Sequence, residues 1–145
     1  MPIFNPWKSY RRTAALTAPP GRIILMLFDA GIASLQRARA GFAVRDPAER
    51  NMTIHNNLRR AREVIQQLNI ALDMDKGGEL AATLGRLYDY FNRRLLESDV
   101  KKTPQGVDEV IGHFTVLRDA WAAMLRKEEV RVAPESGMVP SLATT

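Results

Sequence analysis

The sequence predicts an all-α protein, an antiparallel up-down four-helix bundle at residues 20–130 with an N-terminal arm (1–19) and a disordered C-terminal tail (131–145). Two observations favour this fold. Apolar residues recur at alternating spacings of three and four along four long segments, which is the period of one helical face. The prolines and the Gly77-Gly78 pair lie near the boundaries of these segments, and no stretch alternates with period two as a strand would. The length suits a single domain with one hydrophobic core.

The first two helices are predicted from their boundaries and apolar stripes. The first runs from about Pro20 to Phe42. The second begins at Asp46, whose side chain can accept a backbone N–H, and at Pro47, which fits the first helical position, with Glu49 as in a capping box. Their expected core stripes are Ile24, Phe28, Gly31, Leu35, Ala38 and Phe42 in the first helix, and Ile54, Leu58, Ala61, Ile65, Leu68 and Leu72 in the second.

The other two helices follow from the same signals. Gly77 and Gly78 break the chain as a helix-to-helix turn, where glycine can take a positive φ. Thr103 and Pro104 supply a cap and a first-turn proline for the last helix. The expected core stripes are Leu80, Leu84, Leu87, Phe91 and Leu95 in the third helix, and Val107, Val110, Phe114, Leu117, Trp121 and Met124 in the fourth.

The net charge of +5 resides mainly in the arm. Residues 1–22 carry Lys8, Arg11, Arg12 and Arg22 without an acid, whereas the remainder has 17 basic and 16 acidic residues. Nucleic-acid readers need a strongly basic body, so we expect no nucleic-acid binding by the bundle. The outward-facing arginines on the second helix are expected to be solvated, and Arg94 is expected to lie at the edge of the core or pair with an acid.

The sequence offers no recognisable catalytic, cofactor or metal site. There is no cysteine, and neither His55 nor His113 has the Glu-x-x-His spacing of a bundle metal site, so both are expected to be solvated or hydrogen-bonded. A phosphate-binding loop is also missing. The longest apolar run ends at Asp29, too short for a membrane span, and the N-terminus does not resemble a secretory signal. We therefore expect a non-enzymatic, cytoplasmic protein with no stable membrane insertion.

Apolar residues in excess of the core stripes predict a partner-binding surface. A stripe of about 100° suffices to face a core, and the helices carry further apolar or small residues outside it. Such a surface suits an amphipathic helix laid along the bundle. The residues predicted to bind a partner are Tyr10, Leu16, Ile23, Leu25, Met26, Met52, Ile70, Gly85, Gly112, Val116, Ala120 and Ala123.

The arm carries a high density of large apolar residues without a helical period. These are Ile3, Phe4, Trp7, Tyr10 and Leu16. Because so many aromatic and aliphatic side chains are unfavourable in water, the arm is expected to fold back into a groove of the bundle. If partners use that groove, the arm is a displaceable cover.

An ordered set of short motifs resembles the flagellin-specific export chaperones, the FliS family. The resemblance covers roughly Tyr10 to Met124, and each motif alone is weak. Departures are local: Pro19 stands at a usual capping serine, Gly21 at a glutamate, Phe28 at a tyrosine and Ala30 at a glycine. The motifs are Tyr10-Arg11, Leu16–Pro20, Ile23–Asp29, Leu72-Asp73, Gly77–Ala81, Leu84, Leu87–Tyr90, Arg94-Leu95, Asp108–Val110 and Leu117–Trp121.

The resemblance implies a non-enzymatic four-helix bundle that binds the C-terminal helical region of flagellin in the cytoplasm. It would prevent premature polymerisation and aid delivery to the flagellar type III export apparatus, with the export gate as a second candidate partner. It also places Tyr10 near the binding surface. We expect a monomer or a weak homodimer when the protein is free. The alternative is a small helical regulator or adaptor that binds nucleic acid through the basic N-terminal arm.

Overall fold

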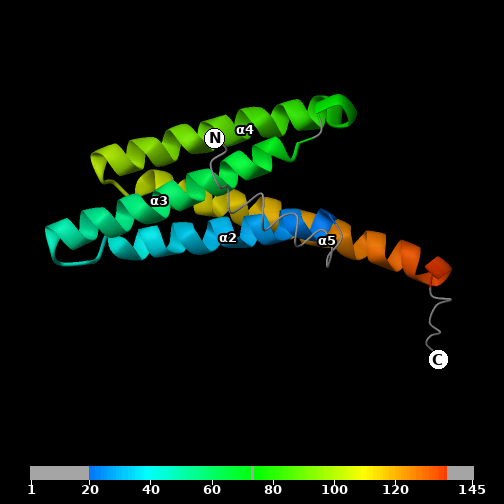
Figure 1. The fold of residues 1–145 in the computed structure, drawn as a ribbon, viewed down its shortest axis with the longest axis horizontal. Coiled ribbons are helices and arrows are strands. Elements are labelled where there is room, and N and C mark those ends of the chain that lie inside the picture. The colour runs from blue at the N-terminus through cyan, green and yellow to red at the C-terminus, as the bar shows by residue number, and fades with distance from the viewer. Residues whose placement is uncertain (1–19, 73, 137–145) are drawn as a thin grey trace, which may run out of the picture.

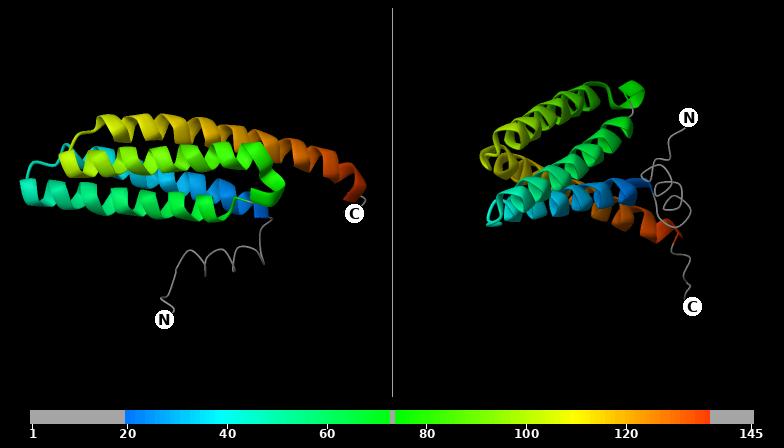
Figure 2. Two further views of the ribbon diagram at one scale, coloured as in Figure 1. Left: turned by 90° about the horizontal axis from the view of Figure 1, so that it is seen from above. Right: turned by 60° about the vertical axis from the view of Figure 1, so that its left-hand side comes forward.

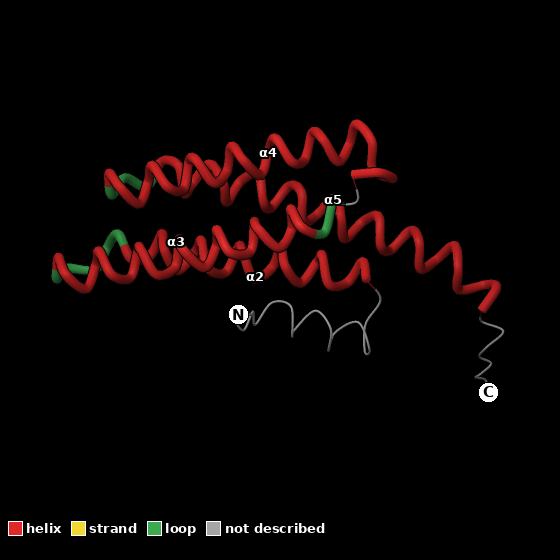
Figure 3. The backbone as a smooth tube through the Cα atoms, turned by 45° about the horizontal axis from the view of Figure 1, so that its top comes forward, coloured by secondary structure: helices red, strands yellow, loops and turns green. Residues whose placement is uncertain are grey.

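The described residues, 20–72 and 74–136 of a computed structural model, form four helices without a strand (Figure 1). They are α2 (Pro20–Gly41), α3 (Pro47–Ile70), α4 (Met74–Lys101) and α5 (Gln105–Ser136). Short loops join successive helices (Figure 3), and each helix packs against two others: α2 and α4 both contact α3 and α5. The predicted all-α, up-down bundle is confirmed.

The helix boundaries follow local chemistry that the sequence shows. Asp46 caps α3 in an extended conformation (φ −67°, ψ 122°), and its side chain accepts a 2.8 Å hydrogen bond from the Glu49 N–H. Pro47 occupies the first turn, as predicted. Lys102, at φ 55°, ends α4 in the left-handed region, and the Thr103 N–H donates to the Ser98 carbonyl oxygen at 3.2 Å.

The glycine break lies inside α4. Gly78 has φ 55° and ψ −126°, so the predicted positive-φ turn is present, yet one short helical turn from Met74 precedes it. A residue with a Cβ would be strained in this conformation. The break therefore reorients the chain where it passes from α3 into the long part of α4.

The last helix extends past its predicted end at residue 130 and reaches Ser136. The segment from Lys127 to Ala133 contains no glycine or proline to stop the helix, so residues 131–136, predicted to be disordered, are helical. Residues 137–145 and the arm at 1–19, with Tyr10 and Leu16, lie outside the described residues. The arm and the disordered tail therefore stay predictions.

The core contains an aromatic cluster contributed by α2, α4 and α5. Phe114 is fully buried and contacts Phe28 and Phe91 edge-on, with ring centroids 5.4 and 5.7 Å apart. Gly31 lets α2 approach this cluster, because a Cβ there would lie 2.5 Å from Phe114 Cε2. Other fully buried residues of the predicted stripes are Leu35, Ala38, Ile54, Leu58, Ala61, Ile65, Leu95, Val107 and Val110.

The helices separate at the end of the bundle that lies away from the α2–α3 and α4–α5 loops. Figures 1 and 2 show α4 and the C-terminal half of α5 diverging from the loop that joins them. This open end is where the apolar stripes of the bundle remain accessible.

Candidate functional site: an apolar groove between α4 and α5

A groove with an apolar lining lies at the open end of the bundle. Its volume is about 270 Å³. Helices α2 and α3 contribute the floor, and α4 and α5 contribute the walls. The lining residues, which define the apolar groove, are Ile24, Phe28, Leu68, Ala71, Leu72, Leu80, Leu84, Tyr88, Leu117, Ala120, Trp121 and Met124.

Side-chain exposure increases along α4 and α5 toward the groove. On α4, Phe91 is fully buried, Leu84 is half-buried and Leu80 is 67% exposed. On α5, the exposed fraction rises from zero at Phe114 to 42% at Met124. Leu80 and Met124 were both expected in the core, and this expectation is wrong. Among the described residues, the apolar stripes of α4 and α5 diverge here and leave Leu80 and Met124 exposed.

Trp121 is held in the wall of the groove by a hydrogen bond to α2. Its indole Nε1 donates to the Gly21 carbonyl oxygen at 2.8 Å. Gly21 permits this close packing, because a Cβ there would lie 2.5 Å from Leu125 Cδ2. With its N–H satisfied, the indole offers a large apolar surface in a fixed position. Tyr88 is also buried in the lining, and burial raises its pKa to about 12.

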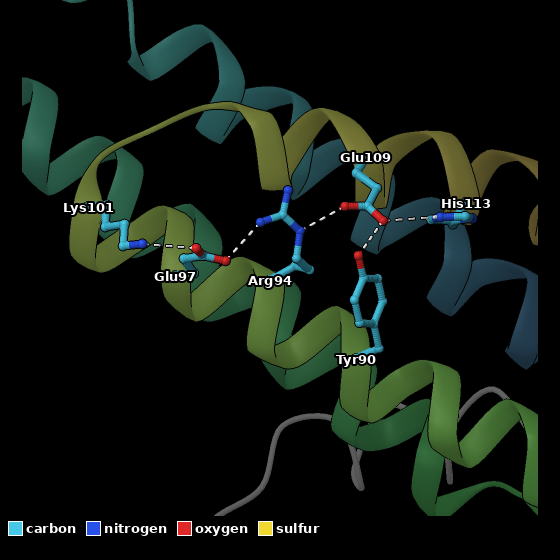
Figure 4. Close-up of polar contacts among 6 residues, drawn as sticks. All are labelled: Tyr90, Arg94, Glu97, Lys101, Glu109 and His113. Carbon is cyan, nitrogen blue, oxygen red and sulfur yellow. Dashed lines mark hydrogen bonds and ion pairs between the residues drawn. The ribbon is translucent and has the colours of Figure 1, made fainter.

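A polar network joins α4 to α5 where the groove begins (Figure 4). The Tyr90 hydroxyl donates to Glu109 Oε2 at 2.6 Å, and Arg94 Nε donates to Glu109 Oε1 at 2.7 Å. Arg94 also pairs with Glu97 at 2.8 Å, and Lys101 pairs with Glu97 at 3.1 Å. The prediction that Arg94 pairs with an acid is confirmed.

The network favours the charged forms of its carboxylates. The hydrogen bond from Tyr90, followed by that from Arg94, lowers the pKa of Glu109. The hydrogen bonds from Lys101 and Arg94 lower the pKa of Glu97. Both carboxylates are thus ionised at neutral pH, and the cross-link holds the closed part of the α4–α5 interface.

The two histidines have structural partners. His55 Nδ1 lies 2.7 Å from Asp99 Oδ2, and His113 lies 3.6 Å from Glu109 while its ring stacks on Phe91. The expectation that they are hydrogen-bonded or solvated is confirmed: His55 is hydrogen-bonded to Asp99, and His113 is 47% exposed. Within 20–72 and 74–136, no three His, Asp or Glu side chains are grouped as a metal site would need, and no described helix has the length and apolarity of a membrane span.

Most of the residues predicted to bind a partner do not line the apolar groove. Ala120 alone among those described lines the apolar groove. As predicted, several face outward: Met26, Met52, Ile70, Gly112 and Val116 are exposed, but none of them lines the groove. Ala123 is half-buried.

Three predicted positions face other helices. Ile23 is 5% exposed and belongs to the core, although it was predicted to bind a partner. Leu25 is half-buried and lines a hollow shared by α2 and α5. A Cβ on Gly85 would meet Asn69 Oδ1 on α3 at 3.7 Å. Because each helix packs against two neighbours, it buries a sector wider than the single 100° stripe assumed.

The sequence patterns assigned most of the groove to the core. The signal that could have identified it is the length of the last helix: α5 has 32 residues, whereas α2 and α3 have 22 and 24. The apolar stripe of α5 therefore extends beyond what these shorter helices can cover.

Comparison with known proteins identifies the family. Residues 3–128 match the family model described as flagellar protein FliS. The chain belongs to the FliS family. The resemblance found in the motifs is confirmed, and the FliS match spans the whole of the apolar groove.

Curated FliS relatives are similar over most of their length. The flagellar secretion chaperone FliS of Bacillus subtilis is 36% identical over 128 residues, 88% of this chain and 92% of the relative. That of Salmonella typhimurium is 36% identical over 110 residues, 75% and 78% of the two chains. The flagellar secretion chaperone FliSB of Pseudomonas aeruginosa is 33% identical over 104 residues, 72% and 79%. These FliS relatives are named as chaperones, a role that a protein can perform through non-covalent apolar contacts alone.

Proposed function

We propose that this protein is a cytoplasmic export chaperone that binds the C-terminal helical region of flagellin. It keeps flagellin from polymerising prematurely and aids its delivery to the flagellar type III export apparatus. The observation that carries the proposal is the apolar groove between α4 and α5 in a protein of the FliS family. The names of the relatives as flagellar secretion chaperones support it further.

The groove has the chemistry that an amphipathic helix needs. A helix laid in a groove presents apolar side chains at i, i+3, i+4 and i+7. Leu80 and Met124 are exposed on opposite walls, and fully burying such a side chain contributes roughly 1.5–3 kcal/mol. The occupant loses conformational entropy when it orders, so a long apolar contact is required to compensate. Covering the apolar face of a flagellin helix removes the surface through which it would assemble.

A matched pair of variants on α4 tests the groove. Leu80 and Val100 are both exposed, at 67% and 76%, but only Leu80 lines the apolar groove. We expect Leu80→Glu to weaken binding of a labelled flagellin C-terminal fragment by about tenfold or more, because a charge would be desolvated on binding. Val100→Glu should bind as the unchanged protein does. Equal affinity for all three proteins would contradict the proposed site.

Salt dependence separates this function from the nucleic-acid alternative. Apolar binding of the flagellin fragment should change little between low and physiological salt, whereas binding to phosphates falls steeply. We therefore expect a shallow salt slope for the fragment and no comparable affinity for a duplex DNA. Strong, steeply salt-dependent DNA binding without flagellin binding would favour the regulator or adaptor.

Delivery has its own test. We expect the complex with flagellin to bind the cytoplasmic part of the export gate more tightly than either protein alone. Size-exclusion chromatography of the three components, with Leu80→Glu as the control that lacks flagellin, measures this. A gate that binds flagellin equally without the chaperone would overturn the delivery step alone.

A further inference from the structure

A second groove, on the outer face of α3 and α4, has a polar and basic lining. Its volume is about 430 Å³, and it shares no residue with the apolar groove. The residues that carry the argument, which define the basic groove, are Arg59, Arg62 and Gln66 on α3 and Asn92, Arg93 and Leu96 on α4. Figure 1 shows these two helices side by side along their length.

The register of the two helices brings the key residues together. His55 of α3 pairs with Asp99 of α4 at 2.7 Å, and further along Asn69 lies beside Gly85. The same antiparallel register places Arg62 opposite Asn92, in the middle of the groove. The basic groove is therefore lined by residues from both helices, whose relative positions are set by this register.

The charge of the basic groove is only partly neutralised. Arg59 pairs with Glu63, the single carboxylate of the lining, at 3.2 Å. Arg93 lies over the Tyr90 ring at 6.0 Å, and neither Arg62 nor Arg93 forms an ion pair with any described carboxylate. The neighbouring Arg94 contrasts with them, because it is paired with both Glu97 and Glu109. Two guanidinium groups therefore remain available for an anion.

Two shielded polar atoms in the groove lack partners. Arg62 Nε and Asn92 Oδ1 are inaccessible to solvent, and neither has a hydrogen-bond partner among the described residues. Because these two atoms are shielded, a ligand in the groove would contact the outer parts of the Arg62 and Arg93 side chains that line it. A peptide offers a carboxylate to the guanidinium and backbone donors and acceptors to the amide side chains. A phosphate offers acceptors alone, and Leu96, 49% exposed, adds an apolar contact that suits a peptide.

We propose that the basic groove between α3 and α4 binds an acidic peptide segment of a partner protein, whose carboxylates pair with Arg62 and Arg93. This surface is separate from the apolar groove, so an acidic segment and an apolar helix can be held at the same time. The proposal does not depend on flagellin being the occupant of the apolar groove.

The test uses the full-length chain and a short labelled peptide with glutamates spaced three and four residues apart. Its control is the same peptide with glutamines. We expect the glutamate peptide to bind and the glutamine peptide to bind about tenfold or more weakly. The double variant Arg62→Gln/Arg93→Gln should lose about tenfold or more, because hydrogen bonds to charged groups are the strong ones.

Two variants keep the result specific. Arg60→Gln removes an exposed charge of the same helix that does not line the basic groove, and it should leave peptide affinity unchanged. Leu80→Glu, which tests the apolar groove, should also leave it unchanged. Circular dichroism establishes that every variant remains helical.

Several outcomes would overturn the proposal. These are no binding of the glutamate peptide, equal binding of the glutamine peptide, or an equal loss in Arg60→Gln. A single-stranded DNA that binds more tightly than the peptide and is lost in the double variant would instead make this a nucleic-acid site.

Discussion

The Tyr90 hydroxyl donates a 2.6 Å hydrogen bond to Glu109 Oε2, and this bond joins α4 to α5 at the edge of the apolar groove. Two residues earlier on α4, Tyr88 already lines the groove. The second oxygen of Glu109 accepts from Arg94 at 2.7 Å, so the carboxylate is held on both sides (Figure 4). The network therefore fixes the position from which the two walls diverge.

We predict that Glu109→Gln lowers stability more than Tyr90→Phe does. The tyrosine variant loses one hydrogen bond and leaves the Arg94–Glu109 ion pair, whereas the glutamine variant removes the charge that both partners contact. Because the groups share one network, the double variant should cost less than the sum of the single changes. Urea unfolding of the four proteins measures the cycle.

A control for this cycle is Glu63→Gln. Glu63 pairs with Arg59 within α3 at 3.2 Å, and both side chains are about half exposed. Such a pair contributes little to stability, so we expect almost no change in the urea midpoint. Strict additivity of Tyr90→Phe and Glu109→Gln would show that the network does not act as a unit.

Gly31 and Gly112 are predicted to respond to alanine in opposite directions. A Cβ on Gly31 would lie 2.5 Å from Phe114 Cε2 and 3.2 Å from Val64 Cγ1, so overpacking should cost about 1–3 kcal/mol and exceed the helix-propensity gain. A Cβ on Gly112 meets nothing within 4 Å, and Gly112→Ala should stabilise by about 0.5–1 kcal/mol. Thermal unfolding compares them. A stabilised Gly31→Ala protein would mean that α2 and α5 pack less closely than described.

Acid should destabilise the protein through its paired carboxylates. Burial alone would raise the pKa of Asp99, but hydrogen bonds from Lys102 at 2.5 Å and His55 at 2.7 Å together lower it. A carboxylate with a lowered folded-state pKa contributes stability that is present above its unfolded value, near 4, and is lost as the pH falls through the folded value. We therefore predict that the thermal midpoint falls below about pH 4.

Asp99→Asn isolates this contribution. The variant should be less stable than the unchanged protein at neutral pH, and the difference should shrink as the pH is lowered. Glu79→Gln is the control, because Glu79 is exposed and makes no hydrogen bond or ion pair to another described residue. Parallel midpoint curves for Asp99→Asn and the unchanged protein would contradict the assignment.

The sequence predicts where helices form better than it predicts which of their apolar stripes are buried by other helices. The capped start of α3 at Asp46 and Pro47 could be predicted because it depends only on residues close in the sequence, and it is confirmed. Ile23 and Met124 were misplaced because their environment depends on which distant helix lies nearby. Periodicity identifies an apolar face but does not show whether a partner helix is long enough and close enough to cover it.

The basic groove shows the same limit. The outward orientation of Arg59 and Arg60 was predicted from the helical period, and both are exposed. The position of Arg62 opposite Asn92 depends on the register between α3 and α4, which no pattern within one helix contains. From the charge of its arginines, the outer face of α3 was predicted to be solvated, whereas in the structure this face forms one side of the basic groove.

The predicted arm provides the last test. Residues 1–19 lie outside the described part of the chain, and their aromatic side chains predict a cover for an apolar groove. If the arm occupies the apolar groove of the free protein, a partner must displace it, and the apparent affinity is reduced by the fraction of protein that is covered. Deleting residues 2–16 should then raise affinity for the flagellin fragment and increase binding of a hydrophobic dye. The double variant Trp7→Ser/Tyr10→Ser in the full-length chain should also raise fragment affinity and dye binding. If both quantities are unchanged in the deletion and in the double variant, the arm does not cover the groove.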